Sequence, residues 1–172
     1  MMRWPAFAIC AICVLTLQVA IAPRFELFGQ RPDWLLVVIV FFALYSRSAD
    51  AVLGAWCIGM VADLMSIERF GLLSLSYAGA CLGVVAVRTY LFRHHLITQV
   101  VVTFLAGAML QCVWTVYQIL LYEQIGLTMA AAIGNVIVGA AYTAMWVPPI
   151  HWLLQRRSRS FGIVRPRYLY SG

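Results

Sequence analysis

Long apolar stretches separated by short polar connections dominate the chain. The apolar segments are residues 5–22, 34–45, 51–65, 70–87, 96–122 and 128–154. A helix needs about 20 mostly apolar residues to cross a bilayer. The second and third segments are separated only by SRSAD, and together they are too long for one span, so two short helices with a tight turn are expected. The pattern predicts an all-α, polytopic membrane helix bundle with six transmembrane helices.

The composition agrees with a membrane protein. Of the 172 residues, 64% are hydrophobic and only 10% are charged, and the mean hydropathy is +0.91. Soluble domains carry about 25% charged residues, and a soluble fold of this size could not hide so many apolar side chains. We expect one six-helix transmembrane domain at 1–155 and a basic cytoplasmic tail at 156–172.

The arginines predict the orientation of the bundle. The net charge is +6, and all twelve basic residues are arginine. With six spans and a cytoplasmic N-terminus, nine arginines fall on inner segments and three on outer loops. The inner ones are Arg3, Arg47, Arg88, Arg93, Arg156, Arg157, Arg159, Arg165 and Arg167, and the outer ones are Arg24, Arg31 and Arg69. This bias places both termini in the cytoplasm, and it makes the tail a contact for anionic lipid and not for nucleic acid.

Two features near the N-terminus have a second interpretation. Arg3, the apolar core and AIA at 20–22 are similar to a signal peptide, but Pro23 directly after the small residues argues against cleavage. Cys10 and Cys13 form a C-x-x-C inside a candidate membrane helix, without the βαβ context of a redox motif. We interpret the five cysteines as small buried apolar residues and predict no metal and no cofactor.

Asp63 is the only carboxylate well inside an apolar run, near the end of the third segment. Charged groups at membrane depth are rare and suggest function. One interpretation is structural: Asp63 accepts hydrogen bonds from backbone N–H groups at the start of the fourth helix, or it pairs with Arg69. The other interpretation is contact with a partner or ligand. The sequence leaves both open.

Several polar residues are expected in the outer half of the bundle. Gln111, Thr115 and Gln118 share one face of the fifth helix because their spacing is i, i+4 and i+7. Tyr77 and Asn135 fall at a similar depth in neighbouring helices. Interhelical hydrogen bonds would explain all of them. The alternative is an outward-facing polar groove formed by Tyr77, Gln111, Gln118 and Asn135.

Small residues and prolines predict how helices pack. Gly79 and Gly83 form a G-x-x-x-G on the fourth helix, and Gly54 and Gly59 lie on the third, which suggests a tight hairpin of these two helices. Pro148-Pro149 should bend the sixth helix. We expect His151, just beyond the bend, at the membrane interface.

The sequence has no motif that would support catalysis. It lacks a P-loop, H-E-x-x-H, G-x-S-x-G and paired carboxylates, and it has no convincing internal repeat of the kind that transporters show. We therefore do not expect an enzyme.

One region resembles a known family. GAWCIGMVADLMSIERFGLLSLSYAGACLG, at 54–83, has a glycine-rich helix, a G-x-x-x-D ending at Asp63, a short loop and F-G-L. Together with RPDWLLVVIVFFALYSR before it, this looks like the core of the rod shape-determining protein MreD family. The resemblance is close over 31–88 and loose elsewhere, and the exclusive use of arginine and the long arginine-rich tail depart from it. Gly59, Asp63 and Gly71 match the family motif.

The resemblance implies a non-catalytic scaffold or regulatory subunit of the bacterial cell-elongation machinery in the inner membrane. Partners of such a subunit are MreC, a single-span periplasmic protein, and, in a larger complex, RodA, a class B penicillin-binding protein and MreB. The implied fold is similar to the S components of energy-coupling-factor (ECF) vitamin transporters.

Two further hypotheses stay open. In the first, the chain is an S-component-like subunit that holds a vitamin-type ligand in an outer polar pocket. In the second, it is an ion-coupled carrier that uses Asp63. Ligand carried through purification would favour the first, and transport abolished in a folded Asp63→Asn variant would favour the second.

Overall fold

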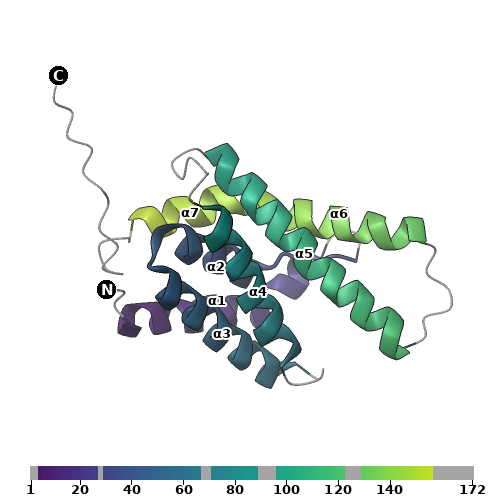
Figure 1. Ribbon diagram of the computed structural model, residues 1–172, viewed down its shortest axis with the longest axis horizontal. Helices are drawn as coiled ribbons and strands as arrows, with labels where there is room; N and C mark the ends of the chain where they lie inside the picture. The colour runs from purple at the N-terminus through teal and green to yellow at the C-terminus, as the bar shows by residue number, and fades with distance from the viewer. Residues whose placement is uncertain (1–3, 27–28, 67–70, 89–95, 123–128, 157–172) are drawn as a thin grey trace.

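The protein is an all-α bundle. The computed structural model describes residues 4–26, 29–66, 71–88, 96–122 and 129–156 (Figure 1). The helices in these ranges are α1 (Trp4–Ala20), the 3-10 turn η1 (Ala22–Phe25), α2 (Trp34–Tyr45), α3 (Ser48–Met65), α4 (Leu72–Val87), α5 (Leu96–Tyr122), α6 (Met129–Met145) and α7 (Val147–Arg156). The predicted fold class is confirmed. The basic tail, from residue 157 onward, lies outside the described residues.

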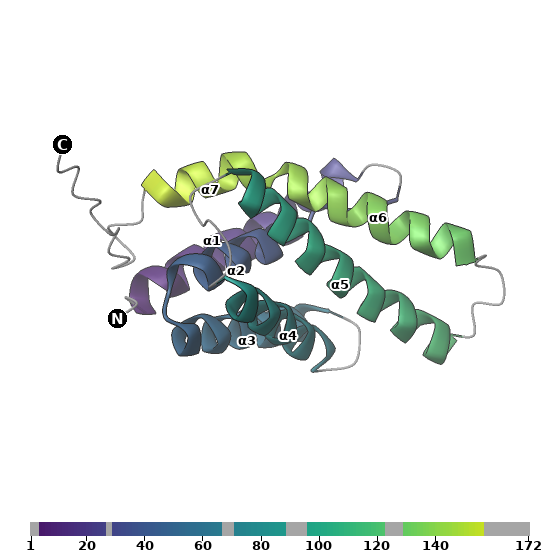
Figure 2. The ribbon, with the colours of Figure 1, turned by 45° about the horizontal axis from the view of Figure 1, so that its top comes forward.

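Successive helices run in alternating directions through the bundle. α1 begins and α7 ends at the same end, on the left in Figures 1 and 2, which we call the proximal end. α1, α3 and α5 end at the opposite, distal end, where α2, α4 and α6 begin. The described chain therefore crosses the bundle an even number of times, as the predicted topology requires.

Three helical stretches among the described residues are long and apolar enough to cross a membrane: Ser48–Met65, Ile97–Ile119 and Ala132–Arg156. Three shorter apolar helices accompany them: Trp4–Ala20, Trp34–Tyr45 and Leu72–Val87. Many large apolar side chains on the outer surface are exposed, including Ile9, Leu64, Leu75 and Ile97. These side chains suit a lipid solvent, and the protein is a membrane protein.

α2 is the centre of the bundle. It contacts each of the other six α-helices given above, and the eleven residues from Trp34 to Leu44 are all buried. A helix that is apolar on every side is stable inside a protein core or in lipid, and here the neighbouring helices surround it. This explains why α2 is only 12 residues long, about 18 Å at 1.5 Å per residue: it does not have to match the thickness of the lipid.

The last apolar segment is broken into α6 and α7. α6 ends at Met145, Trp146 lies in a turn, and Pro148 and Pro149 occupy the first turn of α7. Proline has no N–H to donate, and it is tolerated in the first turn because those N–H groups have no intrahelical acceptor. The predicted bend is confirmed.

α3 and α4 form the tight hairpin that the sequence predicts, and this pair and the α5–α6 pair make the most extensive helix contacts in the bundle. The glycine that allows the approach is Gly59, because a Cβ built there would lie 2.4 Å from the Cα of Ser74. Gly79 and Gly83 have open space at the Cβ position. The expectation that their G-x-x-x-G face packs in the hairpin was wrong.

The proximal end is held together by Arg88. Its guanidinium donates to the carbonyl oxygens of Ala43 and Ser46, each at 2.7 Å, and to Ser48 Oγ at 2.7 Å. The C-terminus of α4 is thereby attached to the turn between α2 and α3. Arg88 thus has a structural role besides its place in the arginine bias.

His151 is buried inside the bundle, with an exposed fraction of 0%. Its Nδ1 lies 2.8 Å from Gln99 Oε1 and its Nε2 lies 3.2 Å from the carbonyl oxygen of Val37. Gln99 Nε2 in turn donates to the hydroxyl of Tyr45 at 2.8 Å. The expectation of an interfacial His151 was wrong, because the bend before α7 turns this side chain toward α2 and α5.

Candidate functional site: the polar distal end of the bundle

Asp63 organises the start of α4. Its Oδ2 accepts the backbone N–H groups of Gly71 at 3.1 Å and Ser74 at 3.0 Å, and its Oδ1 accepts that of Leu73 at 2.9 Å. The first N–H groups of a helix have no partner inside the helix, and a negative charge there is favoured by the helix dipole. Asp63 is 3% exposed, so it acts within the protein and does not reach the surface.

The sequence left two structural partners open for Asp63. In the structure its partners are the backbone N–H groups at the start of α4. The other one, Arg69, lies outside the described residues. Since both carboxylate oxygens are occupied, Asp63 holds the end of α3 to the start of α4 across the connecting loop. With Gly59 it forms one packing unit, because Ser74 meets both residues.

Gly71 precedes α4 in a left-handed conformation, with φ of 103°. A Cβ there would meet nothing within 4 Å. Glycine is therefore favoured by the left-handed backbone conformation and not by a lack of room for a side chain. This conformation directs the Gly71 N–H toward Asp63 while α4 begins at Leu72.

We expect Gly71→Ala to lower the melting temperature of the purified protein by about 3 °C, because an L-residue in the left-handed region costs about 1 kcal/mol. Gly79→Ala is the matched control, since its Cβ position is also open but its backbone is helical. A thermal unfolding scan in detergent measures both. Equal melting temperatures for the two variants would contradict the role given to Gly71.

A second carboxylate, Asp33, joins three helices at the distal end. Its Oδ1 accepts the N–H of Leu36 at 3.0 Å, which caps α2, and its Oδ2 accepts the hydroxyl of Tyr77 at 2.8 Å. Its backbone N–H donates to Thr143 Oγ1 at 3.2 Å. α2, α4 and α6 therefore meet at one residue.

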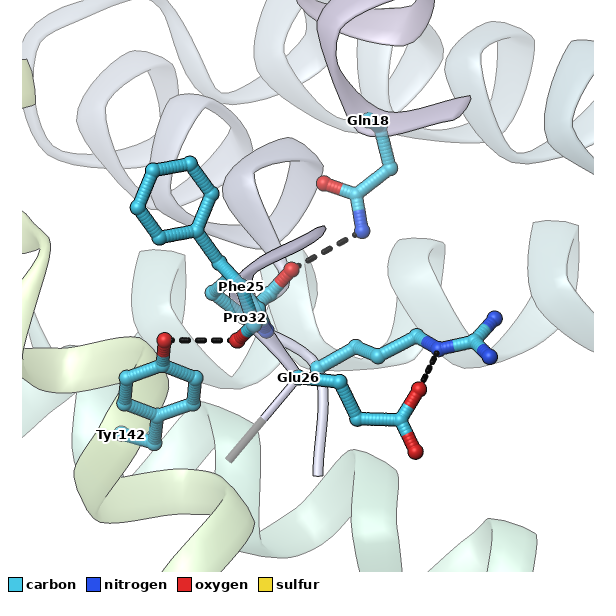
Figure 3. Close-up of polar contacts among 6 residues, drawn as sticks. Gln18, Phe25, Glu26, Pro32 and Tyr142 are labelled. Atoms are coloured by element: carbon cyan, nitrogen blue, oxygen red, sulfur yellow. Dashed lines mark hydrogen bonds and ion pairs between the residues drawn. The ribbon is translucent and has the colours of Figure 1, made fainter. Parts of the chain in front are cut away.

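The segment before α2 is also bound to α1. Gln18 Nε2 donates to the carbonyl oxygen of Pro32 at 2.9 Å (Figure 3), and Gln18 Oε1 accepts the N–H of Trp34 at 2.9 Å. Nearby, Tyr142 donates to the carbonyl oxygen of Phe25 at 2.7 Å (Figure 3). A single amide side chain thus satisfies two backbone groups at the entry to the central helix.

A cavity of about 660 Å³ opens among these elements. Its wall is formed by the end of α1, the segment before α2, the start of α4, the distal half of α5 and α6. The four residues expected to form a polar groove all line it: Tyr77, Gln111, Gln118 and Asn135. Asp63 does not line it, but it positions Leu72, Leu73 and Ser76 of α4, which do.

A comparison with protein families decides which family this architecture represents. The family model of rod shape-determining protein MreD matches residues 1–157. The chain belongs to the MreD family. No curated protein and no solved structure matches it, so the likeness to ECF S components stays a prediction.

Membership of the MreD family makes the chain a rod-shape-determining membrane protein. The match spans all the described helices, so the whole bundle belongs to this family domain. The family is not a known enzyme family, and the described residues contain no group of three or more His, Cys, Asp or Glu that could hold a metal ion.

Asp33 and Gln18 are residues of the distal end that sequence reasoning missed. Asp33 had a readable signal, because an aspartate directly before an apolar run is a helix N-cap pattern. Gln18 had a weaker one, as a lone amide in an apolar segment. The pairing of Asp33 with Tyr77 joins residues 44 positions apart in the chain, and no local pattern reports such a contact.

Proposed function

We propose that this chain is a non-catalytic scaffold or regulatory subunit of the bacterial cell-elongation machinery that synthesises peptidoglycan. In this role it binds an MreC-like single-span periplasmic protein and belongs to a larger complex with RodA, a class B penicillin-binding protein and MreB. The observation that carries the proposal is the match of the MreD family to residues 1–157.

The geometry of the polar side chains supports a scaffold. Asp63, Asp33 and Gln18 are all used to fix helix ends. An ion-coupled carrier built on Asp63 would need a carboxylate that can release its partners, whereas both oxygens of Asp63 accept backbone N–H groups. We propose that Asp63 and Gly59 shape the α3–α4 edge that a partner contacts.

We also propose the bacterial inner membrane as the location, with the proximal end and both termini in the cytoplasm. Nine of the twelve arginines then lie on the cytoplasmic side, as the positive-inside rule requires. The distal end, with its cavity, faces the periplasm and so lies where an MreC-like protein has its folded part.

An S-component-like substrate-binding subunit of a vitamin transporter is the second candidate, and the distal cavity favours it. Such a subunit has to dock an energising ATPase module at its cytoplasmic surface. A scaffold needs neither ATPase nor transported ligand, so the proteins and ligands that accompany the chain distinguish the two candidates.

The test is to purify the tagged chain in mild detergent from its own cells and to identify the accompanying proteins by mass spectrometry. Wild type is compared with Asp63→Asn and with Glu26→Gln, an exposed carboxylate that serves as the control. We expect a single-span periplasmic protein and peptidoglycan synthases with wild type and Glu26→Gln. Loss of these proteins in Asp63→Asn at equal expression would give the α3–α4 edge a role in docking.

Two outcomes contradict the proposal. Recovery of ATPase subunits or of a vitamin-like molecule, without peptidoglycan synthases, would move the assignment to the transporter. If cross-linking wild-type cells before purification recovered neither peptidoglycan synthases nor ATPase subunits, the scaffold role would be contradicted.

A further inference from the structure

We propose that the distal cavity is a binding site for an uncharged ligand of the saccharide class, with several hydroxyl or acetamido groups. The proposal goes beyond the scaffold role and does not depend on it. It rests on the size of the cavity, on its unused amide groups, on its charge and on its aromatic wall.

The cavity has the size of a small-molecule site. Its volume of about 660 Å³ lies within the range of about 300–1,000 Å³ that ligand pockets occupy. It is bounded by five separate segments, which the contacts of Asp33 and Gln18 hold in place. The wall is therefore largely preformed.

Unused carboxamides line this wall. The side-chain amides of Gln30, Gln111, Gln118 and Asn135 make no hydrogen bond within the described part of the chain. Each amide carries two N–H donors and an acceptor oxygen. Donors and acceptors side by side suit hydroxyl and acetamido groups, which are themselves both donors and acceptors.

Two of these amides meet over Gly139 of α6. A Cβ at this glycine would lie 2.6 Å from Gln111 Nε2 and 2.8 Å from Gln30 Oε1. The missing side chain allows amide groups from α5 and from the segment before α2 to lie against the backbone of α6. These two amide ends come from positions far apart in the chain and converge on one wall of the cavity.

The charges in the wall disfavour an anionic ligand. Arg31 is the one cation in the described lining, and its Nε is paired with Glu26 Oε2 at 2.9 Å. Asp33 is occupied by Tyr77 and by the N-terminus of α2. The described lining thus has two carboxyl groups, Glu26 and Asp33, against one guanidinium. This balance favours a neutral molecule over a phosphate or carboxylate ligand.

Trp114 supplies an aromatic surface beside the amides. It lines the cavity and stacks with Tyr117 on the same helix, with ring centroids 5.8 Å apart and an interplanar angle of 27°. An aromatic ring next to a few hydrogen-bonding groups offers both an apolar face and polar contacts. The apolar C–H face of a sugar ring matches that combination.

The experiment is saturation-transfer NMR on the full chain with N-acetylglucosamine as the probe. The detergent has to be zwitterionic, because a maltoside carries a saccharide headgroup that would compete. We expect saturation transfer to N-acetylglucosamine and none to the anionic N-acetylneuraminic acid. A second arm places the chain in nanodiscs with a neutral glucosyl glycolipid and measures retained lipid by native mass spectrometry.

Variants locate the site. Gly139→Ala should displace the amide ends of Gln30 and Gln111 and weaken binding by about tenfold. Gly134→Ala on the same helix is the matched control, since nothing lies within 4 Å of its Cβ position. Asn135→Ala removes an exposed amide with little risk to folding and should also weaken binding.

The results distinguish a soluble sugar from a glycolipid headgroup as the source of the ligand, and they test the proposal itself. Binding of the free sugar supports a soluble ligand, and binding of only the glycolipid supports a lipid headgroup. Absence of both, equal binding of the anionic sugar, or unchanged binding in Gly139→Ala and Asn135→Ala would overturn the proposal. Partner recovery is a separate readout, so the scaffold function and the saccharide site can fail independently.

Discussion

Replacing Asp63 by alanine is expected to lower the melting temperature of the purified protein by about 10 °C. The substitution leaves the N–H groups of Gly71, Leu73 and Ser74 without their acceptor. Leaving these partly buried donors unpaired costs about 3 kcal/mol in total. In a membrane the cost is not recovered from water, because the only alternative acceptors are other protein groups.

Asparagine at this position gives a graded test. Asp63→Asn keeps one acceptor oxygen but presents an NH₂ group to at least one of the three N–H donors. Its melting temperature should fall between those of wild type and Asp63→Ala in the same detergent. Glu26→Gln is the control, because the Glu26–Arg31 pair is exposed and contributes little to stability. If Asp63→Ala had the same melting temperature as wild type, the carboxylate would not be the group that holds α4 to α3.

Gly59→Ala should separate α3 from α4. The new Cβ would lie 2.4 Å from the Cα and 2.9 Å from the backbone nitrogen of Ser74. Both are backbone atoms of a helix and cannot move without shifting α4 as a whole. We expect a loss of about 3 kcal/mol, the upper part of the range for an overpacked interior, seen as a lower unfolding midpoint and poorer recovery of folded protein.

Gly83→Ala is the matched control for Gly59→Ala. It lies on the partner helix of the same hairpin, where a Cβ meets nothing within 4 Å. Alanine has the better helix propensity, by up to about 1 kcal/mol, so this variant should be unchanged or slightly more stable. Equal damage from both substitutions would mean that helix propensity, and not close approach, decides the effect.

The two substitutions are connected through Ser74, which Gly59 touches and Asp63 binds. Such neighbouring sites are expected to be non-additive. Once Gly59→Ala has displaced Ser74, the geometry of the Asp63 hydrogen bonds is already lost. The double variant should therefore be less destabilised than the sum of the two single variants.

The bundle could be predicted in detail because lipid imposes a simple pattern. α2 and α5 occupy the predicted ranges 34–45 and 96–122, since apolar length and polar interruption define a membrane helix. The Pro148-Pro149 bend was equally readable, because proline acts on its own helix. The structural half of the Asp63 hypothesis depended on a local feature too, the proximity of Asp63 to the next helix start.

Contacts between distant segments were not readable. The G-x-x-x-G of Gly79 and Gly83 suggested a packing face, but helix rotation decides which small residues meet a neighbour, and here Gly59 does. His151 was expected at the interface and is buried against Gln99, because the break before α7 sets its direction. Local sequence patterns do not specify how each helix is rotated about its own axis.

By itself, then, the sequence determined that this protein is a helical membrane bundle of the MreD type with a carboxylate at the α3–α4 turn. The helical membrane bundle follows from apolar length, and the MreD type from the resemblance of residues 31–88 to that family. Only the tertiary structure decided that α2 is the buried centre, that Asp33 joins α2, α4 and α6, and that unused amides converge on one cavity. The physical reason is that these features depend on the rotation and register of whole helices, which many weak contacts set together.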